Sequence, residues 1–383
     1  MKKKIIRITT VPISLAVLLK GQLKFMSNHY EVIGVSSFGR EIALVENQEN
    51  IETHVIEMTR QISPLKDLIS AYKLFKFIKK EKPFIVHTHT PKAGTLGMLA
   101  ARLAGVSNRL HTVAGMPLLE ATGAKRQLLN IVEKVTYANA TLVLPNSYGL
   151  KKIIKDLNFT TEKRLRIIGN GSSNGIDTDY FNKSNINLSQ RYNLMQQLSI
   201  VQEDFVFVYV GRLVADKGIN ELVSAFNSIS KTYNKIKLLL VGPLETELDP
   251  LNNQTILIIE SNKNIITVGW QSDVRPYLAI SNALVFPSYR EGFPNVVMQA
   301  CAMELACIVT DINGCNEIIT NNKNGLVIQP KSIEALQYAM QFFIDNPVKT
   351  SEFASVARPN ILENYKREVI WNELLNLYKS LET

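Results

Sequence analysis

The feature that most constrains this chain is a repeated alternation of short apolar runs with amphipathic helical patterns. Helical patterns such as 65–82 and 125–138 separate the runs. This alternation is typical of parallel sheets with helices on both faces, and its two series predict an α/β fold with two doubly wound domains. The runs of the first half are KIIRITT (4–10), YEVIGVSS (30–37), ETHVIEM (52–58), FIVHTH (84–89), RLHTV (109–113), ATLVLP (140–145) and LRIIG (165–169), and those of the second half are DFVFVYVG (204–211), IKLLLVG (236–242), NIITVGW (264–270), ALVFPS (283–288), ACIVTD (306–311) and NGLVIQ (324–329).

The length of 383 residues also fits two domains better than one. The polar stretch FNKSNINLSQRYN (181–193) is the candidate junction between them. We therefore expect a first domain over residues 1–183, joined by a C-terminal helix at 367–383. The second domain is expected over residues 184–366.

The positive charge of the chain is concentrated in its first half. Residues 1–185 carry 27 Lys and Arg against 14 Asp and Glu, a net charge of +13, and the rest of the chain carries −4. Such a basic half suits an anionic partner, either nucleic acid, an anionic membrane surface or a phosphorylated acceptor, although a solvated basic surface is the alternative. No basic motif interleaved with aromatic residues supports nucleic acid, so none is expected as a partner.

The N-terminal segment raises the question of a signal peptide. Three lysines precede an apolar run, but Arg7 interrupts that run and no cleavage site follows it. No stretch approaches the roughly 20 apolar residues that span a bilayer. We expect a cytoplasmic protein without a transmembrane helix.

The pattern at 65–82 has two interpretations. Leu65, Leu68, Ile69, Tyr72, Phe75 and Ile78 recur at helical spacing, and five lysines occupy the other faces of the helix. The first interpretation is a core-facing stripe with a solvated basic face. The second is a helix that docks on anionic lipid headgroups.

Two loops that follow predicted strands in the second half suggest a binding site, because ligands of doubly wound sheets bind beyond the carboxyl ends of the strands. In GRLVADKG (211–218), Gly211 ends the strand, and Arg212 and Lys217 flank a turn before a helix. Helix N-terminal amides and two cations favour a diphosphate. The alternative is a pair of ordinary surface cations.

The second loop lies in PSYREGFPNVVMQACAM (287–303). Pro294 suits a helix start, and the amides around Gly292, Phe293 and Asn295 are expected to face the ligand. The carboxylate of Glu291 repels phosphate but accepts hydrogen bonds from hydroxyls. Together the two loops therefore predict a site for a sugar joined to a diphosphate, with Gln299 turned toward the same crevice.

These segments resemble retaining glycosyltransferases of family 4, which have the GT-B fold. The resemblance rests on GRLVADKG, PSYREGFPNVVMQA, TDINGCNEII and NGLVI in the second half. In the first half, TTVPISLAVLLKGQLKFM, HTHTPKAGTLGMLAARLAGV, LHTVAG and GNGSSNGIDTDYF resemble the branch that extends lipid-linked bacterial glycans, including N-acetylgalactosaminyltransferases.

The resemblance implies roles for individual residues. Arg212 and Lys217 would hold the donor phosphates, and Glu291 would hold hydroxyls of the donor sugar. His111, in LHTVAG, would be the second catalytic residue, hydrogen-bonded to that sugar. The family has a second glutamate for the ribose where this chain has Gln299, which puts tight ribose binding in doubt more than activity.

The acceptor side is indicated more weakly. In HTPKAG (89–94), His89 and Lys92 lie at a strand end and a helix start, where they are candidates to bind an anionic acceptor group such as a lipid diphosphate. An ordinary strand-to-helix turn explains them equally well. Asp177 and Asp179 have the spacing of a metal-binding pair, but the resemblance implies a metal-independent enzyme, so neither metal nor cofactor is expected.

The resulting hypothesis is a glycosyltransferase that moves a hexose or N-acetylhexosamine from a UDP-sugar to an undecaprenyl-diphosphate-linked saccharide. It would act in capsule, O-antigen or glycan biosynthesis, at the inner face of the plasma membrane, as a peripheral enzyme. Two alternatives stay open. One is a sugar-nucleotide epimerase of the same fold, and the other is a non-catalytic protein that binds sugar-nucleotide or nucleic acid.

Overall fold

The computed structural model describes residues 2–59, 61, 63–119, 121–247 and 249–382, which form two compact units. Unit 1 comprises Met1–Gly175 and Arg367–Thr383, and unit 2 comprises Ile176–Lys366. The division falls earlier than the boundary expected after residue 183. The reason is local, because the Ile176 amide donates a hydrogen bond to the Tyr365 carbonyl at 2.8 Å, and both residues belong to unit 2.

Unit 1 contains a six-stranded parallel sheet in the order β3-β2-β1-β4-β5-β6. Only LRIIG, among the seven predicted strands, is not one. Leu165 forms an isolated bridge with Val143, after which Gly169 and Gly171 adopt positive φ and turn the chain away. The strands are β1 Lys4–Ile8, β2 Glu31–Ser36, β3 Glu52–Val55, β4 Ile85–Thr88, β5 Asn108–Val113 and β6 Leu142–Pro145.

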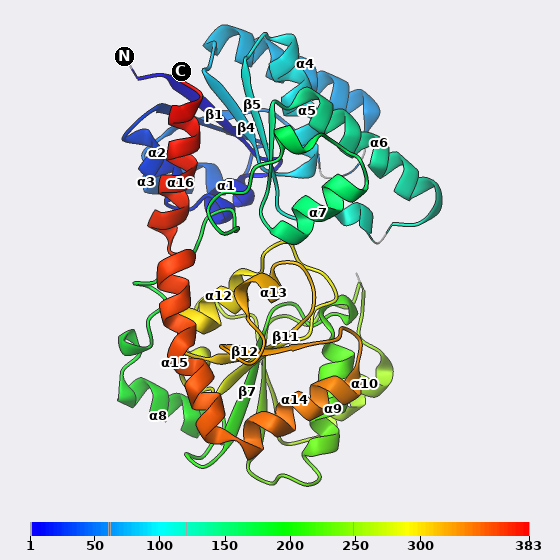
Figure 1. Cartoon of the computed structure of the whole chain (residues 1–383), viewed down its shortest axis with the longest axis vertical. Coiled ribbons are helices and arrows are strands. Elements are labelled where there is room, and N and C mark those ends of the chain that lie inside the picture. Colours follow the sequence, from blue (N-terminus) through cyan, green and yellow to red (C-terminus); the bar gives the residue numbers. More distant parts are fainter. Residues whose placement is uncertain (1, 60, 62, 120, 248, 383) are drawn as a thin grey trace. The chain divides into compact units, whose positions relative to one another are not determined.

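Helices cover both faces of this sheet (Figure 1). One face packs against α4 to α7, and the other packs against α1, α2, α3 and the C-terminal helix α16. The helices are α1 Pro12–Leu18, α2 Gln22–Ser27, α3 Glu41–Glu49, α4 Pro64–Glu81, α5 Pro91–Leu103, α6 Gly123–Asn139, α7 Tyr148–Asp156 and α16 Arg367–Ser380, with 3-10 turns at Pro117–Leu119 and Glu162–Arg164.

Unit 2 contains a second six-stranded parallel sheet, in the order β12-β11-β10-β7-β8-β9. All six strands predicted for this half are present, and β10 and β11 are buried along their whole length, as expected for central parallel strands. The strands are β7 Phe205–Val210, β8 Ile236–Val241, β9 Ile265–Gly269, β10 Ala283–Phe286, β11 Ala306–Thr310 and β12 Gly325–Ile328. The predicted α/β fold with two doubly wound sheets is confirmed.

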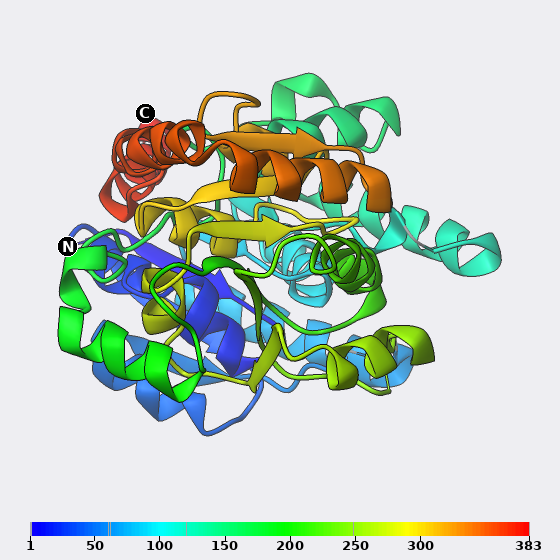
Figure 2. The same ribbon diagram turned by 90° about the horizontal axis from the view of Figure 1, so that it is seen from below.

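The helices of unit 2 also lie on both faces of its sheet. Helix α9 packs against α10 and α14, whereas α12 packs against α15, and Figure 2 shows α14, in orange, alongside the strands. The helices are α8 Leu188–Gln197, α9 Ile219–Ile229, α10 Asn253–Ser261, α11 Arg275–Ala279, α12 Asn295–Ala302, α13 Cys315–Ile318, α14 Ile333–Asp345 and α15 Pro347–Asn364, with 3-10 turns at Lys183–Asn185 and Ala215–Lys217.

Helix α4 buries only the C-terminal part of its apolar stripe. Its buried residues are Ser70, Leu74 and Ile78. The interpretation as a core-facing stripe is therefore wrong for most of its members, since the side chains of Leu65, Leu68, Ile69 and Tyr72 are 80%, 70%, 56% and 55% exposed. Within the described part of the chain, no helix is both long enough and apolar enough to cross a membrane.

Candidate active site

The strand order of unit 2 brings the two candidate donor loops together. Strands β7 and β10 are neighbours, and the connections on either side of them run in opposite directions across the sheet. A crevice forms at such a switch point, beyond the carboxyl ends of the two strands. The loop at 211–218 follows β7 and the loop at 287–294 follows β10, so both border this position.

Glycine allows the two loops to approach each other closely. Gly218 has φ +72° and precedes α9, and a Cβ atom on it would lie 2.2 Å from the carbonyl oxygen of Pro287. Gly211 also has positive φ, at +152°. Arg212 lies between these glycines with an exposed side chain. The loop therefore presents a cation and the first amides of α9 at the switch point.

The sharpest feature of the site is the ion pair between Lys217 and Glu291. Lys217 Nζ lies 2.5 Å from Glu291 Oε1, and each side chain is 18% exposed. Ser288 Oγ donates a second hydrogen bond to the same carboxylate oxygen, at 3.0 Å. The predicted phosphate-binding cation and the predicted sugar-binding carboxylate are thus in direct contact, although 74 positions separate them in the sequence.

Two further contacts tie the loop at 287–294 to the loop at 211–218 and to helix α9. Arg290 Nη2 lies 2.8 Å from Asp216 Oδ2, and the Tyr289 hydroxyl donates to Glu221 Oε1 at 2.6 Å. Burial raises the pKa of Asp216, and the neighbouring Asp249 adds to the increase while Lys217 opposes it. The loops are consequently held by charge-assisted bonds that limit their motion.

A third loop, which follows β11, contacts the backbone of Glu291. Asn313 Nδ2 donates to the backbone carbonyls of Glu291 and Gly292, the latter at 3.3 Å. Gly314, with φ +77°, approaches so closely that a Cβ atom there would lie 2.5 Å from the Gly292 carbonyl oxygen. Sequence reasoning assigned no role to Asn313, Gly314 or Ser288. The segment TDINGCNEII carried the only signal for the first two, as part of the resemblance.

The remaining donor-loop residues lie at the start of α12. Gly292, Phe293 and Pro294 are buried, Pro294 is the N-cap of α12, and Asn295 is its exposed first residue. Gln299 is half-buried within α12, between fully buried neighbours. In the chain as described, no residue hydrogen bonds to its side-chain amide, which leaves that amide available to a ligand.

His111 lies in the carboxyl-terminal half of β5 in unit 1 and is almost fully buried. Its Nδ1 atom is 2.8 Å from Thr88 Oγ1, and Gly94 of α5 covers the ring, so a Cβ at position 94 would lie 2.3 Å from His111 Cε1. Burial lowers the pKa of His111 to about 4. The imidazole is therefore neutral at physiological pH and can accept a hydrogen bond as well as donate one.

His89 lies on the opposite face of the same sheet, within a buried polar network. Its Nε2 accepts a hydrogen bond from Arg7 Nε at 2.9 Å, and its ring centroid lies 4.1 Å from that of His87. Arg7 is fully buried and also donates to Gln22 Oε1 at 2.5 Å. Burial, His87 and Arg7 together lower the pKa of His89 well below its usual value.

Lys92 is paired within unit 1. Its Nζ lies 2.5 Å from Asp67 Oδ2 of α4 and 2.9 Å from the Gln61 carbonyl, and its side chain is only 12% exposed. His89 and Lys92, both candidates for acceptor binding, therefore have different partners, and none of these hydrogen bonds joins one to the other. The ion pair neutralises the Lys92 charge, so a bound anion would have to compete with Asp67.

Asp177 and Asp179 have backbone-directed contacts. Asp177 Oδ1 accepts a hydrogen bond from the Tyr180 amide at 2.9 Å, and the Asp179 carbonyl accepts one from Asn185. The first contact caps a turn. Across the described residues, no three His, Cys, Asp or Glu side chains form a group suited to a metal ion.

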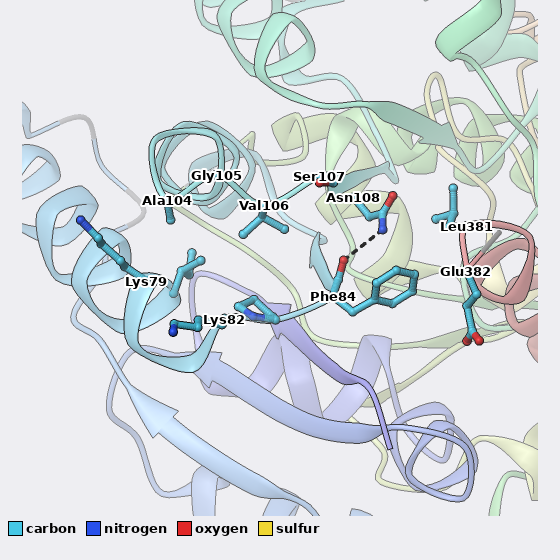
Figure 3. Close-up of a pocket in the computed structure, with 12 residues that line it drawn as sticks. Lys79, Lys82, Phe84, Ala104, Gly105, Val106, Ser107, Asn108, Leu381 and Glu382 are labelled. Carbon is cyan, nitrogen blue, oxygen red and sulfur yellow. Dashed lines mark hydrogen bonds between the residues drawn. The ribbon is translucent and has the colours of Figure 1, made fainter. Parts of the chain in front are cut away.

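A depression of about 680 Å³ lies at the other edge of the unit 1 sheet (Figure 3). It borders the amino ends of β4 and β5, where Asn108 Nδ2 donates to the Phe84 carbonyl at 3.1 Å, and Lys79 and Lys82 stand at its margin. Ligands of doubly wound sheets bind at the carboxyl edge. We therefore assign the candidate site to the loops described above.

The two doubly wound sheets, with donor-type loops at the β7/β10 switch point, define the class as GT-B-type glycosyltransferases. Residues 190–360 match the family described as "Glycosyl transferases group 1", and residues 15–147 match "Glycosyl transferase 4-like". The chain therefore belongs to the group 1 glycosyltransferases, and its relatives are glycosyltransferases as well. The matches favour this hypothesis over the epimerase and the non-catalytic binding protein.

Two relatives and one solved structure illustrate the similarity. The capsular polysaccharide biosynthesis glycosyltransferase CapM of Staphylococcus aureus is 34% identical over 380 residues, covering 99% of this chain and 97% of its own. The Escherichia coli UDP-Gal:alpha-D-GlcNAc-diphosphoundecaprenol alpha-1,3-galactosyltransferase is 33% identical over 300 residues, covering 76% and 74%. The Anabaena protein HepE, solved with UDP-glucose, shares the fold with a TM-score of 0.80 at 18% identity, covering 99% of this chain and all of its own.

Proposed function

We propose that this enzyme transfers a hexose or N-acetylhexosamine, with retention of configuration, from a UDP-sugar to a lipid-linked saccharide during surface polysaccharide synthesis. The observation that carries the proposal is the contact between Lys217 and Glu291 at the switch point of unit 2. A phosphate-binding cation beside a hydroxyl-binding carboxylate matches the two halves of a sugar diphosphate. Neither half alone would need both charges.

In this proposal the chain stabilises the leaving group with its own cations. When the bond between the anomeric carbon and the diphosphate oxygen breaks, UDP leaves with the electron pair. Arg212, Lys217 and the first amides of α9 then face the developing negative charge. Because an ammonium has three donors, Lys217 can keep Glu291 as a partner while it binds a phosphate oxygen. No metal ion enters the mechanism.

Glu291 and His111 act on the sugar. The carboxylate accepts hydrogen bonds from donor hydroxyls. Ser288 donates to this carboxylate, and Asn313 donates to the backbone carbonyl of Glu291. The neutral imidazole of His111 hydrogen-bonds to the sugar without adding positive charge. The acceptor hydroxyl attacks the anomeric carbon on the face that UDP leaves, and its proton passes to the departing phosphate, which gives retention.

The named relatives support the choice of substrates. The E. coli relative uses UDP-Gal and a diphosphoundecaprenol-linked sugar by name, and CapM is named for capsular polysaccharide biosynthesis. HepE was solved with UDP-glucose. We infer a UDP-sugar as donor and a polyprenyl-diphosphate-linked saccharide as acceptor.

The surface of α4 supports a peripheral position on the inner face of the plasma membrane. Leu65 and Ile69 are 80% and 56% exposed, and Lys66, Lys73 and Lys80 are exposed on the same helix. Exposed apolar side chains flanked by lysines suit an anionic lipid surface, where each basic residue contributes about 1 kcal/mol. The membrane would thereby bring the enzyme to its acceptor.

Calorimetric titration with UDP tests the donor site. Removing one charge-assisted contact costs about 1.5–3 kcal/mol, so Lys217→Ala and Arg212→Ala should each weaken UDP binding by about tenfold to a hundredfold. Lys237→Ala is the matched control, because Lys237 donates to Asn264 near the amino end of β8, at the other edge of the sheet. Unchanged UDP affinity in both site variants would show that the phosphate assignment is wrong.

A further inference from the structure

Unit 1 carries an apolar groove between α4 and α5. Its volume is about 380 Å³, and its lining consists of Leu68, Tyr72 and Phe75 of α4, Leu99 and Leu103 of α5, and two alanines between them. Leu68 and Leu103 lie outside the core, since they are 70% and 67% exposed, whereas Ala100 at the floor of the groove is buried. A soluble protein rarely leaves so continuous an apolar surface without a ligand or partner for it.

Two lysines place positive charge at the rim of the groove. Lys76 Nζ lies 4.7 Å from the centroid of the Tyr72 ring, and Lys79 Nζ lies 5.4 Å from that of Phe75. Both aromatic rings line the groove, so each ammonium group lies against a ring of its wall, and Lys79 also borders the depression at the amino ends of β4 and β5. The combination of an apolar trough and a cationic rim is complementary to an amphiphile with one hydrocarbon chain and an anionic head.

The lining also argues against an extended peptide as the occupant. An extended peptide carries an unpaired amide and carbonyl at each residue, and both need hydrogen-bond partners when they leave water. The side chains that line the groove supply only one polar atom group, the Tyr72 hydroxyl. A hydrocarbon chain needs no such partners and gains from every apolar contact.

We propose that this groove binds part of the prenyl chain of the lipid-linked acceptor, with Lys76 and Lys79 near its diphosphate. The inference rests on the proposed function, because it takes the acceptor to be a polyprenyl diphosphate. It adds that the protein itself holds the lipid chain, which would position the acceptor more narrowly than the bilayer does. Recognition of the acceptor would then include its lipid as well as its sugar.

The probe for this proposal is farnesyl diphosphate, a short soluble prenyl diphosphate, titrated calorimetrically into the full chain below its micelle-forming concentration. The test variant is Leu68→Gln with Leu103→Gln. Both positions are exposed, so the variant should fold as the wild type does, and a melting curve will verify this. The control is Leu188→Gln with Val348→Gln in unit 2, where the side chains are 79% and 73% exposed. Inorganic diphosphate serves as the probe without a chain.

We expect the groove variant to lose at least tenfold in affinity for farnesyl diphosphate, the control to bind normally, and inorganic diphosphate to bind much more weakly than farnesyl diphosphate. Equal binding of farnesyl diphosphate by the groove variant and the wild type would overturn the proposal. So would equal affinity for the two probes, which would mean that only the head is bound.

Vesicles of phosphatidylglycerol separate the prenyl chain from the membrane surface. If the groove variant loses vesicle binding but keeps its affinity for farnesyl diphosphate, the groove belongs to the membrane-docking surface and the chain proposal is overturned. Failure of the proposed function would look different. In that case the wild type would bind farnesyl diphosphate in the groove yet transfer no sugar to any prenyl-diphosphate-linked acceptor.

Discussion

Replacing Gly94 with alanine tests whether α5 positions His111. The new Cβ would lie 2.3 Å from His111 Cε1, 2.8 Å from Nδ1 and 3.0 Å from Nε2. Ordinary contact begins at 3.4 Å, so the ring or the helix must move by about 1 Å. The ring has little room to move, because it is 4% exposed and hydrogen-bonded to Thr88.

The expected change in stability follows from two opposing terms. Overpacking a buried site costs about 1–3 kcal/mol. Alanine in a helix interior is about 0.5–1 kcal/mol better than glycine. We therefore expect Gly94→Ala to lower the free energy of unfolding by about 1–2 kcal/mol. A displacement near 1 Å at a catalytic group can reduce the rate by about a hundredfold, so turnover should fall by about tenfold to a hundredfold.

Two measurements separate the effects, namely urea unfolding and turnover on a defined donor and acceptor. Gly34→Ala is the control for stability alone, because its Cβ would meet Ile51 Cδ1 at 3.3 Å, away from His111. If Gly94→Ala is as stable as the wild type and equally active, α5 does not press on His111. If the variant loses stability but keeps full turnover, His111 does not contact the reacting sugar.

Four other outcomes are expected. Burial lowers the pKa of His111 from 6.5 to about 4, so between these two pH values the unfolded chain binds more protons than the folded chain. The contribution of the neutral His111 to the free energy of unfolding is therefore complete above pH 6.5, and about 3 kcal/mol of it is lost as the pH falls through 4. Melting curves of the wild type and His111→Asn will measure this loss. Glu291→Ala should abolish most turnover while UDP affinity in calorimetry stays within a few fold; near-normal turnover would remove its sugar role. Gln299→Glu should tighten UDP binding by at most about 1 kcal/mol and keep its melting temperature, because position 299 is only half-buried; a large fall in melting temperature would mean a structural residue. Activity should survive EDTA, and rescue by manganese after inhibition would point to Asp177 and Asp179.

Local sequence patterns were sufficient for most of the elements. Runs such as ACIVT and ALVF are short and apolar on both faces, as central parallel strands are, and they form β11 and β10. Glycines such as Gly218, which adopt positive φ, likewise mark a turn from the local sequence alone. These features depend on neighbours along the chain, so the sequence by itself determined all the strands but LRIIG, the loops and the fold class.

Only the tertiary structure decided which loops meet and which apolar faces are covered. Local sequence patterns do not reveal the strand order. That order makes β7 and β10 neighbours and brings Lys217 Nζ to 2.5 Å from Glu291 Oε1. The stripe on α4 has the periodicity of a core helix, yet Leu65 and Leu68 stay exposed because burial depends on what packs opposite. Arg7 shows the reverse case. It interrupts an apolar run, and it is nevertheless fully buried, because Gln22 and His89 come from distant elements to accept its hydrogen bonds.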